Sequence, residues 1–128
     1  MSTPKKPIQI PNAPAPVGPY SQAILKGQTL YISGQIPLNP TTGELEINNI
    51  EQATERVLRN VGALLSEAGF EFQDVTMVSI FMKDLSEFAA MNQIYARFFN
   101  DIPPARQTIE VARLPLDVNI EISCIAQK

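Results

Sequence analysis

Two side chains in the last quarter of the chain have the chemistry to bind and activate a small molecule. Arg106 and Glu121 each lie in a run of alternating residues that is typical of a β-strand. An arginine can hold a carboxylate through two parallel hydrogen bonds, and a glutamate can orient and deprotonate a water molecule about 3 Å away. The two side chains could therefore line one cleft, or they could form a structural ion pair across two strands.

Several other groups could contribute to such a site, and each also has a structural explanation. Tyr20 follows a stiff proline segment, so its hydroxyl could face a ligand or its ring could cover the core. Ser33 and Gly34 end a predicted strand, where the hydroxyl and the next backbone N–H could bind an anion or make a turn. Thr108 shares a strand face with Arg106, because alternate residues of a strand point the same way. Cys124 lies on an apolar face and is expected to be buried and unreactive.

The residue counts exclude several classes of site. The chain has no histidine and one cysteine, which excludes Ser-His-Asp hydrolysis, histidine-held haem, the HExxH zinc site, multi-cysteine zinc sites and an internal disulfide. It contains no Walker A, GxGxxG or CxxC motif, and its net charge of −3 disfavours binding to a nucleic acid. We therefore expect no metal and no cofactor. The chemistry would fall to polar side chains, backbone amides and water.

The length of the chain suits one domain. Its 128 residues are too few for two full cores, so we expect a single domain over residues 1–128. No apolar run approaches the roughly 18 residues that a membrane helix needs, and no membrane contact is expected. The lysines near the start are not followed by an apolar stretch, so a secretory signal is not expected and the cytoplasm is the default location.

Residues 1–19 form a proline-rich arm. They hold six of the eleven prolines, which rules out a helix or a central strand. Ile8, Ile10 and Val17 need cover from solvent, so we expect the arm to be extended and packed on the domain, with a short edge strand around residues 7–10.

The rest of the chain alternates between strand and helix patterns. A helix is predicted over residues 49–68, with Asn49 and Gln52 as a capping box and Gly69 just beyond its end. A second helix is predicted to follow Asp84 and to end near residue 99. The predicted strands are 21–25, 29–33, 74–82, 106–111 and 119–126.

This order favours an α/β (α+β) fold with one mixed sheet and both helices on one face. The other face of the sheet also carries apolar side chains, and self-association is the simplest way to cover it.

The motifs described above resemble those of the Rid family, also called the YjgF family, of imine and enamine deaminases. The matching segments lie in the same order along nearly the whole chain. They are Pro14–Ala23 (PAPVGPYSQA), Leu30–Pro37 (LYISGQIP), Pro104–Arg106 (PAR), Val111–Pro115 (VARLP) and Ile120–Ile122 (IEI).

The resemblance implies a chorismate-mutase-like fold and a homotrimer in which three sheets close into a barrel-like core. The sites would lie in clefts between neighbouring subunits. The implied reaction is the hydrolysis of 2-iminobutanoate or 2-iminopropanoate, and of the related enamines, to 2-oxo acids and ammonia without a cofactor. These reactive acids are released by pyridoxal-phosphate-dependent dehydratases that act on serine or threonine.

The resemblance also implies roles for individual residues. Arg106 would grip the substrate carboxylate and Glu121 would position the attacking water. The residues implied to line the pocket are Tyr20, Ser33, Gly34, Thr108, Asn92 and Phe88. Many members of the family have a cysteine where this chain has Thr108, so a thiol-dependent role is in doubt here, whereas the backbone N–H can still donate.

Two other functions fit the same scaffold. The cleft could bind small carboxylates and regulate without turning them over, because a fold does not determine function. An endoribonuclease that inhibits translation is a third possibility, which the net charge and the lack of histidine disfavour.

Overall fold

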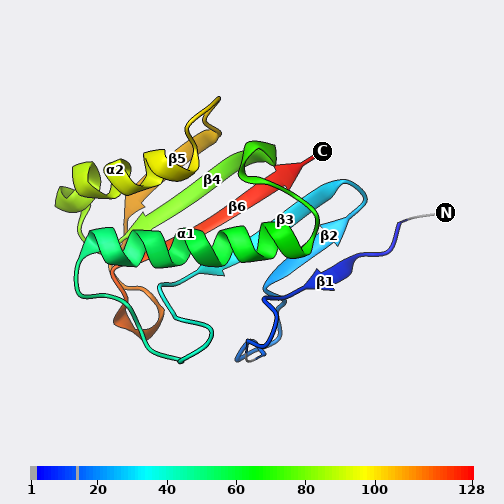
Figure 1. Ribbon diagram of the computed structural model, residues 1–128. Helices are drawn as coiled ribbons and strands as arrows, with labels where there is room; N and C mark the ends of the chain where they lie inside the picture. The colour runs from blue at the N-terminus through cyan, green and yellow to red at the C-terminus, as the bar shows by residue number, and fades with distance from the viewer. Residues whose placement is uncertain (1–2, 14) are drawn as a thin grey trace.

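The computed structural model describes residues 3–13 and 15–128, and these ranges form one six-stranded mixed sheet with two α-helices on one face (Figure 1). The sheet order is β1-β2-β3-β6-β4-β5, in which β4 and β5 are parallel and the other pairs are antiparallel. This confirms the expected fold class. The elements are β1 (Lys6–Ile8), β2 (Ala23–Lys26), β3 (Thr29–Gln35), α1 (Ile50–Glu67), β4 (Val75–Met82), α2 (Phe88–Phe98), β5 (Ala105–Glu110) and β6 (Ile120–Gln127).

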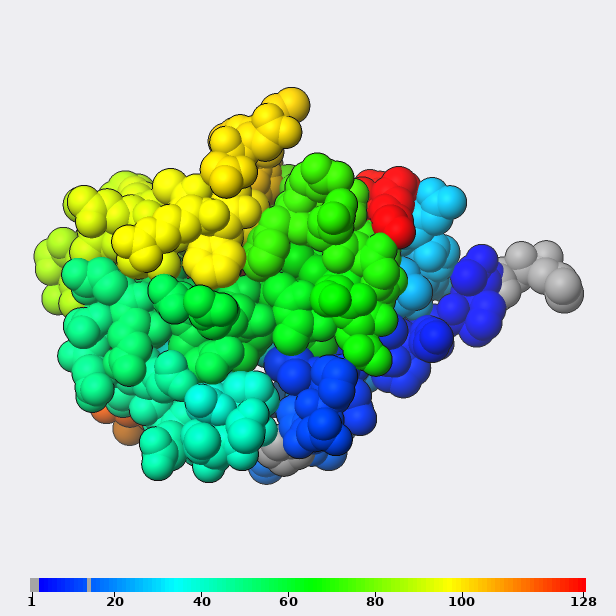
Figure 2. All heavy atoms as spheres, in the orientation of Figure 1, coloured from blue at the N-terminus to red at the C-terminus, as the bar shows by residue number. Residues whose placement is uncertain are grey.

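The proline-rich arm packs on the rest of the chain through its isoleucines. β1 pairs with β2 at the sheet edge, and Ile8 and Ile10 are buried. The Ile10 N–H donates to Gln22 Oε1 at 2.9 Å. The expectation that Val17 is covered as well is wrong, since this side chain is 98% exposed. Pro14 lies outside the described residues. In the space-filling view the blue residues of the arm lie against the green residues of α1 (Figure 2).

α1 begins and ends where the sequence predicts. The Asn49 side chain accepts a hydrogen bond from the Gln52 N–H at 2.7 Å. The return bond of a capping box is shifted by one residue, because Gln52 Oε1 accepts from the N–H of Asn48 instead. Gly69 follows the helix with φ +81°, a left-handed conformation that favours glycine. The predicted apolar stripe of α1 faces the sheet, and Ala53, Val57, Val61, Leu64 and Leu65 are buried.

A buried asparagine ties α1 to the segment that follows β3. Asn60 is 4% exposed, and its side-chain nitrogen donates to the carbonyls of Ile36 and Leu38 at 3.2 and 2.9 Å. These two bonds satisfy backbone groups that would otherwise be buried without partners. The chain leaving β3 is therefore held in place by a residue 22 to 24 positions further on.

The two faces of the sheet differ in their cover. Val78, Ile80 and Met82 of β4 point toward the helices and are fully buried. On the face without helices, Tyr31 and Ile109 remain 50% and 46% exposed. The sequence analysis predicts that another copy of the chain covers this face, and exposed apolar side chains are typical of such an interface.

The single cysteine lies inside the fold. Cys124 is 4% exposed, and burial raises the pKa of its thiol to about 12, which agrees with the expected unreactive cysteine.

Neither α1 nor α2 could cross a membrane. In the part of the chain that the structure describes, no helix has the length and apolar content that a membrane span needs.

Candidate functional site

The Arg106 guanidinium is held between two aromatic rings of α2. Its central carbon lies 4.8 Å from the centre of the Tyr95 ring and 5.5 Å from that of Phe88, and one of its nitrogens donates to Asn92 Oδ1 at 2.8 Å. Phe88, Asn92 and Tyr95 are spaced four and three residues apart, so they share one face of the helix. That face packs over β5, which carries Arg106. The helix therefore supplies both the stacked rings and the hydrogen bond that orient the guanidinium.

The positive charge of Arg106 has no acidic partner among the residues that the structure describes. None of the ion pairs found in residues 3–13 and 15–128 involves it. A guanidinium carries five N–H donors, and the Asn92 bond uses one of them. A half-buried arginine with unused donors is suited to bind an anion, and its planar fork matches a carboxylate.

Two hydroxyl groups near Arg106 are buried without hydrogen-bond partners among the described residues. They belong to Thr108, two residues further along β5, and to Tyr95. Burial raises the pKa of Tyr95 to about 12, and the nearby Arg106 charge opposes that rise only in part. Tyr95 is therefore neutral at physiological pH. We call Arg106, Asn92, Phe88 and Thr108 the arginine half-site.

Glu121 lies on the opposite face of the sheet, against Gly34. A methyl group at position 34 would lie 2.6 Å from Glu121 Cδ and 3.0 Å from its Cγ, so only glycine leaves room for this carboxylate. The register between β3 and β6 shifts between Ile32 and Gln35, which places Gly34 in an irregular part of the ladder. Partial burial raises the pKa of Glu121 above the ordinary glutamate range.

Ser33 and Tyr20 lie near Gly34. The Ser33 hydroxyl donates its proton to the Ser21 carbonyl at 2.6 Å. It can therefore not donate to a ligand at the same time, but its oxygen can still accept a hydrogen bond from one. Tyr20 is 58% exposed, and together with Gly34 it lines a cavity of about 440 Å³ under the arm. We call Glu121, Gly34, Ser33 and Tyr20 the glutamate half-site.

The prediction that Arg106 and Glu121 line one cleft is wrong for a single chain. β4 lies between β5 and β6, so the two strands are not neighbours. Arg106 is paired with Val78, which faces the helices, whereas Glu121 is paired with Phe81, which faces away from them. Partners across a ladder point to the same side, and the two side chains therefore lie on opposite faces. The alternative of a structural ion pair between them is excluded by the same geometry.

The sequence analysis did not predict that Tyr95 contacts the Arg106 guanidinium. Its position at helical spacing from Phe88 and Met91 indicates a core residue, and its ring is indeed 6% exposed. The sequence feature that could have indicated the contact with Arg106 is that Tyr95 lies three residues after Asn92, on the same face of the helix.

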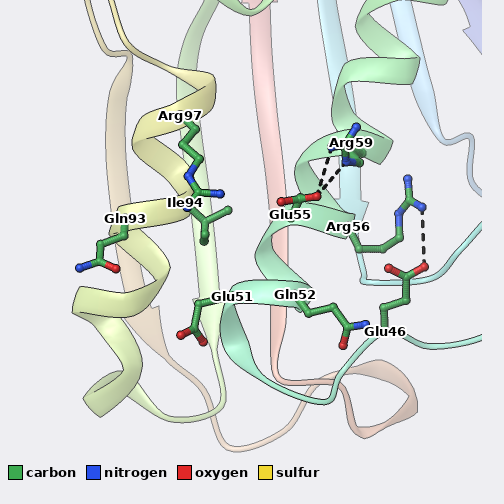
Figure 3. Close-up of a pocket in the computed structure, with 9 residues that line it drawn as sticks. All are labelled: Glu46, Glu51, Gln52, Glu55, Arg56, Arg59, Gln93, Ile94 and Arg97. Carbon is green, nitrogen blue, oxygen red and sulfur yellow. Dashed lines mark hydrogen bonds and ion pairs between the residues drawn. The ribbon is translucent and has the colours of Figure 1, made fainter.

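A groove between the outer sides of α1 and α2 is separate from both half-sites. It has a volume of about 600 Å³ (Figure 3). Its charged groups are partly paired with one another, with Arg59 3.2 Å from Glu55 and Arg56 3.7 Å from Glu46. None of the sequence-predicted site residues lines this groove. Within the described ranges, no group of three or more His, Cys, Asp or Glu side chains is placed to hold a metal ion.

Comparisons with known proteins give a consistent result. Residues 10–128 match the family model described as endoribonuclease L-PSP. The chain is 49% identical over 124 residues to a RutC family protein of Pyrococcus horikoshii, covering 97% of this chain and 98% of the relative. It is 42% identical over 125 residues to the chloroplastic Reactive Intermediate Deaminase A of Arabidopsis thaliana, covering 98% and 67%. A solved structure of a Rid family protein from Yersinia pestis is similar with a TM-score of 0.93 and 44% identity, covering 98% of this chain and all of the other.

The packing of Gly34 against Glu121 predicts a coupling that a double-mutant cycle can measure. Gly34→Ala is expected to reduce the free energy of unfolding by about 1–3 kcal/mol because the new methyl group overlaps the carboxylate. In a Glu121→Ala background the same change should cost roughly 1 kcal/mol less. Denaturant unfolding at one fixed protein concentration would measure both values. Equal costs in the two backgrounds would contradict the close contact.

Proposed function

The chain belongs to the endoribonuclease L-PSP family, which includes the RutC and Rid proteins, and from this premise we propose that it hydrolyses 2-imino and enamine acids to 2-oxo acids and ammonia. The observation that carries the proposal is the Arg106 guanidinium, which lies over two aromatic rings and has no acidic partner in residues 3–13 and 15–128. The similarity to a plant reactive intermediate deaminase supports the same reaction.

In this proposal the arginine half-site binds the substrate carboxylate. The planar fork of Arg106 would make two parallel hydrogen bonds to it, while Asn92 Oδ1 keeps the guanidinium oriented. Phe88 is 39% exposed and would form the apolar wall beside the ligand. The backbone N–H or the unpartnered hydroxyl of Thr108 could donate to the same anion. This arrangement would favour small acids over neutral imines, because a buried charge left unpaired is costly.

The glutamate half-site would supply the proton transfers. Water adds to the carbon of the C=N bond, and Glu121 takes a proton from that water as it attacks. Glu121 passes this proton to the nitrogen, which gives a carbinolamine. The hydroxyl proton of the carbinolamine then goes to the nitrogen as the C–N bond breaks, so that ammonia leaves and the 2-oxo acid remains. An imine carbon is already electrophilic, so positioning alone contributes much of the acceleration, up to about 7–11 kcal/mol in favourable cases. The reaction needs no metal or cofactor.

The two half-sites would meet only between subunits. Within one chain they lie on opposite faces of the sheet, so one subunit would contribute Arg106 and its neighbour Glu121. The exposed Tyr31 and Ile109 lie on the uncovered face that such an assembly would bury. We propose a homotrimer, because contacts between unlike surfaces close into a ring when the rotation between subunits allows it. Its proposed setting is the cytoplasm, beside the dehydratases that release these intermediates.

A non-catalytic carboxylate-binding protein is the second candidate, and one observation favours it. The arginine half-site is complete within a single chain, whereas the proposed proton transfer needs Glu121 from elsewhere. An endoribonuclease, the word in the description of the family model, receives less support from a chain with net charge −3 and no histidine.

Removal of the arginine tests both candidates. Arg106→Ala is expected to weaken 2-oxobutanoate binding by about 2–5 kcal/mol, or roughly 30-fold and more in Kd, because it removes a charged hydrogen-bonding partner. Arg106→Lys should fall in between, since lysine lacks the planar fork. The matched control is Arg97→Ala, which removes an arginine of α2 that faces the groove in Figure 3.

Calorimetry would measure the binding, and a threonine dehydratase coupled to a competing amine trap would measure 2-oxobutanoate release. Equal activity of Arg106→Ala and wild type would contradict the carboxylate role. Binding without any effect on the release rate would instead favour the non-catalytic candidate.

Mixing inactive variants tests the contribution of two subunits. Arg106→Ala and Glu121→Gln are each expected to be inactive as pure assemblies. After unfolding and refolding as an equal mixture, about one quarter of the sites should combine an intact Arg106 with an intact Glu121, because neighbouring subunits supply them. The dehydratase-coupled assay would show the recovered activity. A mixture as inactive as its components would contradict a site between subunits.

The raised pKa of Glu121 predicts the acid side of the pH profile. Only the carboxylate form can accept a proton from water, so kcat/KM should fall as the pH falls through this pKa. Because burial raises the pKa, the midpoint should lie above the ordinary glutamate value. Glu121→Gln should lose this limb along with most of the activity. An acid limb unchanged in Glu121→Gln would assign the titration to another group.

A further inference from the structure

We propose that Tyr95 is a positioning residue, whose buried ring fixes the Arg106 guanidinium and thereby determines how tightly the site holds a carboxylate. This inference rests on the proposed function for its role, but the contact on which it depends lies within one chain. The Tyr95 ring centre is 4.8 Å from the guanidinium carbon, which is closer than the Phe88 ring at 5.5 Å.

The Tyr95 ring is itself held from behind. It is 6% exposed and lies 4.5 Å from the Phe99 ring, centre to centre. Phe99 in turn meets Phe72 edge to face at 5.3 Å. Phe88, the other ring beside the guanidinium, is 39% exposed. Of the two rings beside Arg106, Tyr95 is thus the one with a fixed position.

A fixed ring matters because an arginine side chain is long and flexible. Holding it in one orientation costs side-chain entropy, which a ligand must otherwise supply when it binds. The hydrogen bond to Asn92 fixes one nitrogen and leaves rotation about that contact possible. A ring stacked on the guanidinium restricts that rotation, and a cation–π contact is stronger where water is excluded. The expected effect is on carboxylate affinity, with little effect on the hydrolytic step.

The ring and the hydroxyl of Tyr95 can be separated by mutation. No described residue meets the geometry of a hydrogen bond to the buried hydroxyl, although Arg106 lies close enough to oppose the rise in its pKa. Tyr95→Phe keeps the ring and removes the hydroxyl, whereas Tyr95→Leu removes the ring. Phe98→Leu is the matched control, because it removes a partly buried ring of the same aromatic cluster, which packs on Phe72 at 5.5 Å, centre to centre.

The experiment compares these three variants with wild type in the dehydratase-coupled assay and by calorimetry with 2-oxobutanoate. We expect Tyr95→Leu to raise KM and Kd about tenfold with kcat within about threefold. Tyr95→Phe should stay within about twofold of wild type. Phe98→Leu should lower the melting temperature as Tyr95→Leu does, but leave KM close to wild type.

Two outcomes would overturn the proposal. A rise in KM in Phe98→Leu equal to that in Tyr95→Leu would mean that general loosening of the cluster causes the effect. An equal loss in Tyr95→Phe would assign the role to the hydroxyl.

A second measurement separates this inference from the proposed function. The ¹⁵N relaxation of the Arg106 Nε–H group reports side-chain mobility without any substrate. It should be rigid in wild type, Tyr95→Phe and Phe98→Leu, and mobile in Tyr95→Leu. If the wild-type protein neither hydrolyses imines nor binds 2-oxobutanoate, the proposed function fails while this measurement still decides whether Tyr95 positions Arg106. Equal rigidity in all four proteins would end the inference.

Discussion

The structure depends on a positive charge that is held in place and left unpaired. Arg106 is stacked on the buried ring of Tyr95 and bonded to Asn92, yet no acidic side chain among the described residues neutralises it. Removing part of a guanidinium from water is unfavourable unless an anion replaces the lost solvation. On the helix side of β5 no described acidic side chain compensates the desolvation of Arg106, and a bound carboxylate would compensate it. The same arrangement that costs stability would make the proposed site selective for acids.

The features predicted well from the sequence depend on local patterns. The ends of α1 follow from Asn49 and Gly69, because a cap is determined by a few neighbouring residues. The buried stripe of α1 follows from helical spacing. The predicted strands agree with the observed ones to within two residues at each end, and β3 continues to Gln35 through an irregular register. The mixed sheet with both helices on one face follows from the order of these elements.

The relation between the two half-sites could not be obtained in this way. Alternation along one strand tells which residues share a face, but it does not tell which face of the sheet that is, nor which strand lies between two others. β4 separates β5 from β6, and Arg106 and Glu121 therefore diverge. Tyr95 was missed for a related reason, since a buried aromatic residue of a helix looks the same in the sequence whether it packs on an isoleucine or on a guanidinium.

The burial of Cys124 has a consequence for how this protein would withstand oxidants. The chain has one thiol, which lies under the helices on the buried face of the sheet, and position 108 beside the arginine carries a hydroxyl. Sulfenic acids, mixed disulfides and metal thiolates all begin from an accessible thiolate. Peroxides and disulfides would therefore have no accessible thiolate to react with. The proposed activity would persist under oxidising conditions that inactivate enzymes with a catalytic thiol.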